Sequence, residues 1–134
     1  MSVGGDLDLS HNRITSVGNN VFLLSDVGGS VHMDHNVITS IAPNAFQQFK
    51  VGGNLDLSFN ILTEVATQSF LSPSITGSII LAHNRIASVQ KAAFALATIS
   101  GALDLSFNLL AAVVTEAFVG LTTGLLDLSH NLVP

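Results

Sequence analysis

Short segments of alternating apolar and polar residues recur along the whole chain. In the first of them Asp8 separates Leu7 from Leu9 and Ser10 follows, which is the period-2 pattern of a half-buried strand. An asparagine stands three residues after the second leucine position of every segment. The step from one asparagine to the next is 24 residues four times and then 23. The asparagines of this column are Asn12, Asn36, Asn60, Asn84, Asn108 and Asn131.

Apolar residues follow each asparagine at fixed distances. Ile14, Val17 and Phe22 of the first unit have apolar equivalents in the next four units, and the phenylalanine is present in all five. The chain therefore predicts a single solenoid domain over residues 1–134, with five full repeats and a truncated sixth. In-register units pair their strands in parallel. The return segments, rich in Ser, Thr, Asn and Gly, favour turns and short 3₁₀ segments over long helices.

The pattern L-x-L-x-x-N-x-[IL]-x-x-[VI] followed by Phe resembles the typical 24-residue class of leucine-rich repeats, whose most recognisable string is LDLSxN. This resemblance implies an α/β fold, a right-handed solenoid with a parallel β-sheet on the concave face and turns and short 3₁₀ segments on the convex face. It also implies a non-enzymatic recognition module of a receptor, adhesion or secreted protein. Such a module binds a protein or peptide through the concave sheet, which favours an extracellular or cell-surface location.

One feature departs from that family pattern. The leucine expected three residues before the first strand leucine is missing, and the apolar residue stands one place earlier, as at Val3. A glycine in every unit predicts either a positive φ or a close approach between coils. We interpret it as a bulge that directs the displaced apolar side chain into the core. These glycines are Gly5, Gly29, Gly53, Gly77, Gly101 and Gly124.

The repeated asparagines and phenylalanines are predicted to be structural. A buried Asn amide carries donors and an acceptor, so it can satisfy backbone groups where the strand turns and can connect neighbouring coils. The periodic phenylalanines are expected to form a continuous part of the core. Neither column requires a cofactor.

The outward positions of the strands carry the candidate binding residues. All five histidines lie in two outward columns, one between the strand leucines and one just before the asparagine. For the two phenylalanines among the candidates, packing along their column is the alternative to contact with a ligand. The residues expected to bind a partner are Asp56, Phe59, His83, Asp104 and Phe107.

Histidine and aspartate gather most densely in the first units, and this suggests two further possibilities. A metal site is one, and a face that changes charge near pH 6 is the other. Because duplication copies whole columns without selection for a site, we expect no metal to bind here. The group consists of Asp8, His11, His32, Asp34, His35 and Asp56.

Composition excludes several classes of function. Four Lys and Arg against nine Asp and Glu give a net charge of −5, which disfavours nucleic acid as a partner. Without cysteine the chain has no disulfide, thiolate metal site or cysteine nucleophile. The apolar runs are too short for membrane insertion, and Met1 is followed by no signal peptide. We find no catalytic constellation or phosphate-binding loop and expect neither an enzyme nor a cofactor.

Neither end of the chain has a recognisable cap, so we expect a fragment of a longer array. Two alternatives to the recognition module remain open. One is a structural scaffold that self-associates through exposed repeat ends. The other is an intracellular regulatory repeat array.

Overall fold

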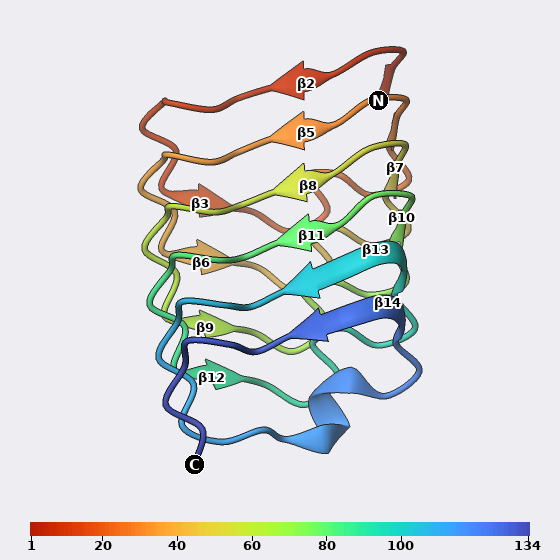
Figure 1. The fold of residues 1–134 in the computed structure, drawn as a ribbon. Coiled ribbons are helices and arrows are strands. Elements are labelled where there is room, and N and C mark those ends of the chain that lie inside the picture. Colours follow the sequence, from red (N-terminus) through yellow and green to blue (C-terminus); the bar gives the residue numbers. More distant parts are fainter.

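The chain winds into stacked coils connected by parallel strands. The computed structural model describes residues 1–134 as a parallel β-solenoid of about five turns, wound in the right-handed sense (Figure 1). Equivalent residues of successive coils are Cα partners, as Leu7 with Val31 and Asp8 with His32 show. The 24-residue spacing read from the sequence is therefore the length of one coil.

Two rows of short strands form the main, ten-stranded sheet. The first row holds β1 (Ser2–Val3), β4 (Asp26–Val27), β7 (Lys50–Val51) and β10 (Ser74–Ile75). The second row holds β2 (Leu7–Asp8), β5 (Val31–His32), β8 (Leu55–Asp56) and β11 (Ile79–Ile80). Two longer strands, β13 (Thr98–Asp104) and β14 (Thr122–Asp127), run through both rows.

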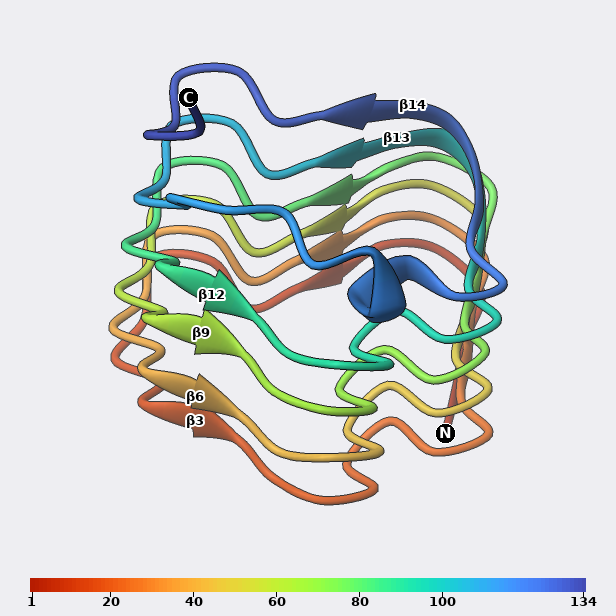
Figure 2. The ribbon, with the colours of Figure 1, turned by 90° about the horizontal axis from the view of Figure 1, so that it is seen from below.

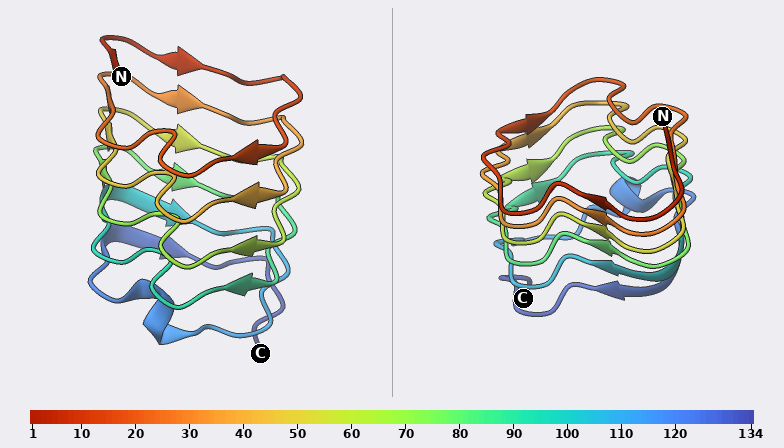
Figure 3. Two further views of the ribbon diagram at one scale, coloured as in Figure 1. Left: turned by 180° about the vertical axis from the view of Figure 1, so that it is seen from behind. Right: turned by 90° about the horizontal axis from the view of Figure 1, so that it is seen from above.

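On the opposite side of the coils the expected turns are present, as at 43–48, but extended segments that the sequence did not predict precede them. Short strands lie there, β3 (Ser16–Val17), β6 (Ser40–Ile41), β9 (Glu64–Val65) and β12 (Ser88–Val89), as Figures 2 and 3 show. The 3₁₀ helix η1 (Thr115–Phe118) is the one helical element. The fold is therefore a β-solenoid with almost no helix, rather than an α/β structure. No helix in it has the length and apolar character needed to cross a bilayer.

Inward-facing columns fill the interior of the coils. Leu55 in β8 and Leu57 directly after it are fully buried on either side of the half-buried Asp56. Phe46, Phe70 and Phe94 are fully buried and stack in a file with centroids 5.0 Å apart. Each such side chain contributes about 1.5–3 kcal/mol by leaving water. The file continues to Phe22 and Phe118 at centroid distances of 5.4 and 5.8 Å.

Asparagine side chains connect each coil to the one before it. The Nδ2 of Asn60 donates to the carbonyl oxygens of Leu57 in its own coil and Met33 in the preceding coil, both at 3.0 Å. Its Oδ1 accepts the backbone N–H of Ile38 at 3.0 Å. The same interlocked pattern continues at Asn36, Asn84, Asn108 and Asn131. Asn12 is exposed, and both acceptors of its amide lie in its own coil.

The glycine corner between the two strand rows is a place of close backbone approach. A Cβ added at Gly101 would lie 2.7 Å from the carbonyl oxygen of Gly77. Gly120 is the one glycine with positive φ, so coil-to-coil contact, and not a left-handed conformation, explains the repeated glycine. In the first four coils the two strand rows consist of separate strands on either side of this corner. The bulge predicted at the glycine appears as a shift in register between the continuous strands β13 and β14.

A second polar column satisfies backbone groups at the corner. Asp6 accepts the N–H of Ser30 at 2.7 Å, and Ser30 in turn accepts the N–H of Asn54 at 3.0 Å. Asn54 accepts the N–H of Ser78, and Ser78 accepts that of Ala102, both at 2.9 Å. The column stops at Ala102, which has no side-chain acceptor. At that coil the two strand segments join into the continuous β13.

Candidate binding face

The strand face comprises the outward residues of the second strand row together with the residue before each asparagine. Asp56 and Asp104 are half-buried on it, and the outward Ile80 stands between them in register. Phe59 and Phe107 keep 47% and 45% of their surface exposed. His83 lies between these two rings. The structure thus brings Phe59, His83 and Phe107 into direct contact, with the two carboxylates on the adjoining strands.

Six rings form an unbroken stack along this face, which we call the aromatic column. Neighbouring centroids are 4.1 to 4.6 Å apart and the planes are inclined by 7° to 14°. Packing along the column, the alternative considered for Phe59 and Phe107, therefore occurs, while their edges remain accessible to solvent. Within the stack a partner would contact ring edges, because each face is covered by the next ring. The members are His11, His35, Phe59, His83, Phe107 and His130.

The backbone of the turn places these rings in one file. All six residues have φ between 52° and 56°, the left-handed region that side-chain-bearing residues enter at a cost. Neighbouring coils stabilise this conformation, since the N–H of His35 donates to Ser58 O at 3.2 Å and that of Phe59 to Ala82 O at 3.3 Å. The Asn that follows each ring fixes the same turn. Side-chain direction is consequently set by the turn and not by the identity of the ring.

The outward aspartates are acceptors for the start of the turn. Asp56 Oδ1 accepts the N–H of Ser58 at 2.9 Å and its hydroxyl at 2.6 Å, and Asp104 accepts the N–H of Ser106 at 2.9 Å. Ser10 makes equivalent bonds to Asp8 and lowers the pKa of that carboxyl; the bond from its hydroxyl has the larger effect and the bond from its N–H the smaller. The N–H and hydroxyl of Ser129 likewise lower the pKa of Asp127. The lowered pKa values keep Asp8 and Asp127 anionic at neutral pH, and these two carboxylates give the face negative charge.

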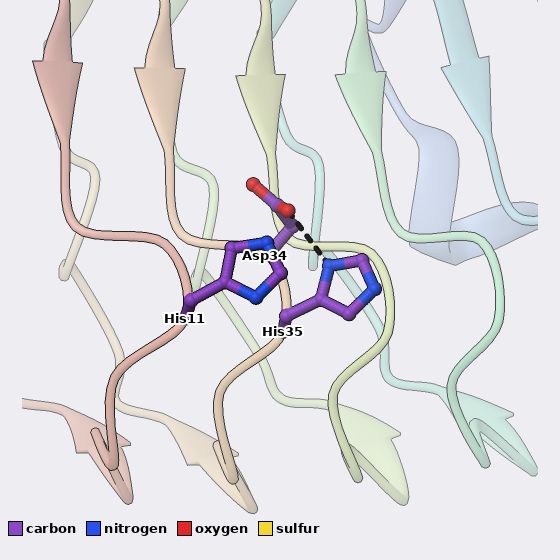
Figure 4. Close-up of side chains that lie close together, drawn as sticks. All are labelled: His11, Asp34 and His35. Atoms are coloured by element: carbon purple, nitrogen blue, oxygen red, sulfur yellow. Dashed lines mark hydrogen bonds and ion pairs between the residues drawn. The ribbon is translucent and has the colours of Figure 1, made fainter.

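The second coil departs from this Asp-x-Ser pattern. His32 and Asp34 stand where the flanking coils have Asp and Ser. Asp34 turns to the aromatic column, where its Oδ2 lies 2.8 Å from Nδ1 of His35 (Figure 4). His11 stacks on His35 with centroids 4.5 Å apart. One ligand atom from each of His11, Asp34 and His35 lies within 4.8 Å of the others, so this trio is the part of the face that could hold a metal ion.

A polar hollow lies away from the predicted residues, on the side of the first strand row. Its volume is about 400 Å³, and it is open to solvent. Sequence reasoning missed this hollow, because its lining combines strand residues with residues of the left-handed turn that precedes each strand, and the repeat pattern does not show that the two lie together. The lining residues are Leu24, Ser25, Asp26, Gln48, Lys50, Ser72 and Ser74.

Comparison with known proteins identifies no relative: no protein-family model, curated protein or solved structure matches the chain. The functional argument therefore depends on the geometry of the strand face. Besides the hollow, two features escaped sequence reasoning: the side-chain ladder at the corner and the contact of Asp34 with His35 on the strand face. The ladder consists of Asp6, Ser30, Asn54 and Ser78. The first had a visible signal, a run of polar residues directly after the glycines.

Proposed function

We propose that this chain is a non-enzymatic recognition module, related to leucine-rich repeats, that binds a protein or peptide through the strand face. The observation that carries the proposal is the aromatic column, whose two phenylalanines are nearly half exposed in the middle of the array. Partly exposed aromatic side chains are typical anchors of protein interfaces. The repeat pattern of the sequence supports the family relation, and with it a place on a receptor, adhesion or secreted protein.

The chemistry of the face indicates what kind of partner would bind. Ring edges carry partial positive charge, so Phe59 and Phe107 favour carbonyl oxygens or the faces of aromatic side chains. The neighbouring carboxylates, Asp56 and Asp104, keep Oδ2 free of the turn bonds and favour Lys or Arg. We therefore propose a peptide segment in which aromatic and basic side chains alternate.

A non-enzymatic role is supported by the state of the serines on this face. Ser58 and Ser106 are 6% and 5% exposed. The hydroxyl of Ser58 donates to Asp56, and the backbone N–H of Ser106 donates to Asp104. A hydroxyl that is buried and donates to a carboxylate is a turn element and not an activated nucleophile, which needs a base such as His as its partner. The exposed groups of the face are rings and carboxylates.

Selection from a displayed random-peptide library on the immobilised chain tests the proposal. Selected peptides are then titrated against Phe59→Ala and Asp104→Arg, with Gln68→Ala and Gln90→Ala as controls away from the strand face. We expect aromatic and basic peptides whose binding weakens at least tenfold, about 1.4 kcal/mol, only in the first pair. Circular dichroism checks folding. Selected peptides that bind Phe59→Ala and Asp104→Arg as well as the unaltered chain would overturn the proposal.

A further inference from the structure

We infer that His11, Asp34 and His35 form a binding site for a divalent transition-metal ion such as Zn²⁺. The site goes beyond the proposed peptide binding, since it lies on the first two coils, at one end of the aromatic column, and requires no peptide. Figure 4 shows both imidazoles beside the Asp34 carboxylate, with a ring nitrogen of each on the carboxylate side. The three ligand atoms lie within 4.8 Å of one another.

Duplication of a column does not explain this trio. Where the second coil has Asp34, the other coils have Ser10, Ser58, Ala82, Ser106 and Ser129. His32 is likewise the one histidine in a column of four aspartates and an isoleucine. Both departures fall in one coil, and Asp34 is the one residue of its column with a carboxylate to offer. Histidine and aspartate recur along the array, but they are densest at this place.

Two imidazoles and one carboxylate are the donor set of Zn²⁺ and related ions, while Mg²⁺ and Ca²⁺ prefer oxygen donors throughout. Bonds of about 2.1 Å in tetrahedral geometry separate ligand atoms by about 3.4 Å. The Asp34 to His35 distance of 2.8 Å is already shorter than this. His11 has to approach by up to about 1.4 Å and to tilt out of its stack on His35, because a ring nitrogen binds a metal in the plane of its own ring; its side chain is exposed and free to do so.

When a metal ion binds, the hydrogen bond between His35 and Asp34 is replaced by bonds from both side chains to the ion, and no proton is gained or lost. His35 now shares a proton with Asp34 through Nδ1. In the metal-bound state that proton moves to Nε2, so Nδ1 and Oδ2 both become ligands, and water completes the coordination. Neighbouring carboxylates add favourable charge, since Asp8 interacts electrostatically with both His11 and His32. The stacked Phe59, 4.6 Å from His35, supports the ring from its other side.

Calorimetric titration of the chain with ZnCl₂ tests the inference. We expect saturable binding of one ion per chain, at least tenfold weaker in His11→Ala, His35→Ala and Asp34→Asn. The matched control is His83→Ala, which removes a ring from the same column and the same left-handed turn. Its affinity should equal that of the unaltered chain. Absence of one-to-one binding, or equal weakening by His83→Ala, would overturn the site.

Nitrogen NMR of the histidine rings in the unaltered chain tests the site without any variant, so the test does not depend on the folding of the variants. Zn²⁺ coordination shifts the ring nitrogens that bind it. Shifts at His11 and His35 with none at His83 and His130 are expected. Uniform small shifts at all the histidines would indicate loose attraction of the ion to a negative surface and would refute a defined site.

Discussion

Removal of a ladder asparagine should destabilise the solenoid by an amount that depends on its position in the array. Asn60 is 5% exposed and makes contacts in three directions. Asn60→Ala does not leave every partner of Asn60 unpaired, because two of the carbonyl oxygens to which it donates have another donor. Met33 O also accepts from Asn36, and Leu57 O also accepts from Asn84, both at 3.1 Å.

The N–H of Ile38 is the group that loses its partner. Asn60 Oδ1 is its one acceptor, and Ile38 itself is fully buried. An unpaired buried N–H costs about 1–3 kcal/mol, so we expect Asn60→Ala to lower the free energy of unfolding by that amount. Asn12 is the matched control, since it is exposed and contacts only its own coil. Asn12→Ala should cost about 0.5 kcal/mol or less.

Urea denaturation, monitored by far-ultraviolet circular dichroism, measures the free energy of unfolding of both variants. An unchanged dependence of this free energy on urea concentration confirms that the same transition is compared. A clearly lower midpoint for Asn60→Ala alone is expected. Equal midpoints for the two variants would refute the reasoning, because they would mean that contacts between coils contribute nothing beyond the turn itself.

Two further predictions concern the corner and the turn. Gly101→Ala should lower the free energy of unfolding by about 1–3 kcal/mol, since its Cβ would lie 2.7 Å from Gly77 O, whereas Gly4→Ala, with nothing within 4 Å, should be neutral in the same urea assay. The pKa of Asp127, lowered from 3.8 by Ser129, makes this carboxylate favour folding above about pH 3.8, and that contribution is lost as the pH falls below this value. Carboxyl-carbon NMR titration should give a pKa below 3.8, and one closer to 3.8 in Ser129→Ala.

The repeat length and the parallel stacking could be predicted because every coil supplies the same apolar columns. The turns of the return segment could be predicted from its composition, but its short strands could not, because Ser16 and Val17 pair only through neighbouring coils. A two-residue strand leaves no periodicity to detect in one unit. Neither hydrophobic pattern nor composition distinguishes it from a turn.

The sequence predicted which residues of the candidate site share an outward column, but not which of their side chains are in contact. Column spacing places Phe59, His83 and Phe107 side by side on successive coils. Their left-handed backbone was hidden, because Phe does not signal positive φ and no glycine stands at these positions. The contact of Asp34 with His35 depends on that turn. Without the turn the sequence shows two adjacent polar residues that would point to opposite faces of a strand.

The corner between the two strand rows allows coils of unequal length to stack in phase. Thr98 pairs with Thr122 across 24 residues, while Leu103 pairs with Leu126 across 23, so one deletion is absorbed between these pairs. Asn131 nevertheless accepts the N–H of Leu110 as its counterparts do. A deletion inside the Leu-Asp-Leu segment would turn every later side chain to the opposite face. Changes in repeat length can therefore accumulate at the corner while the interior and the strand face keep their register.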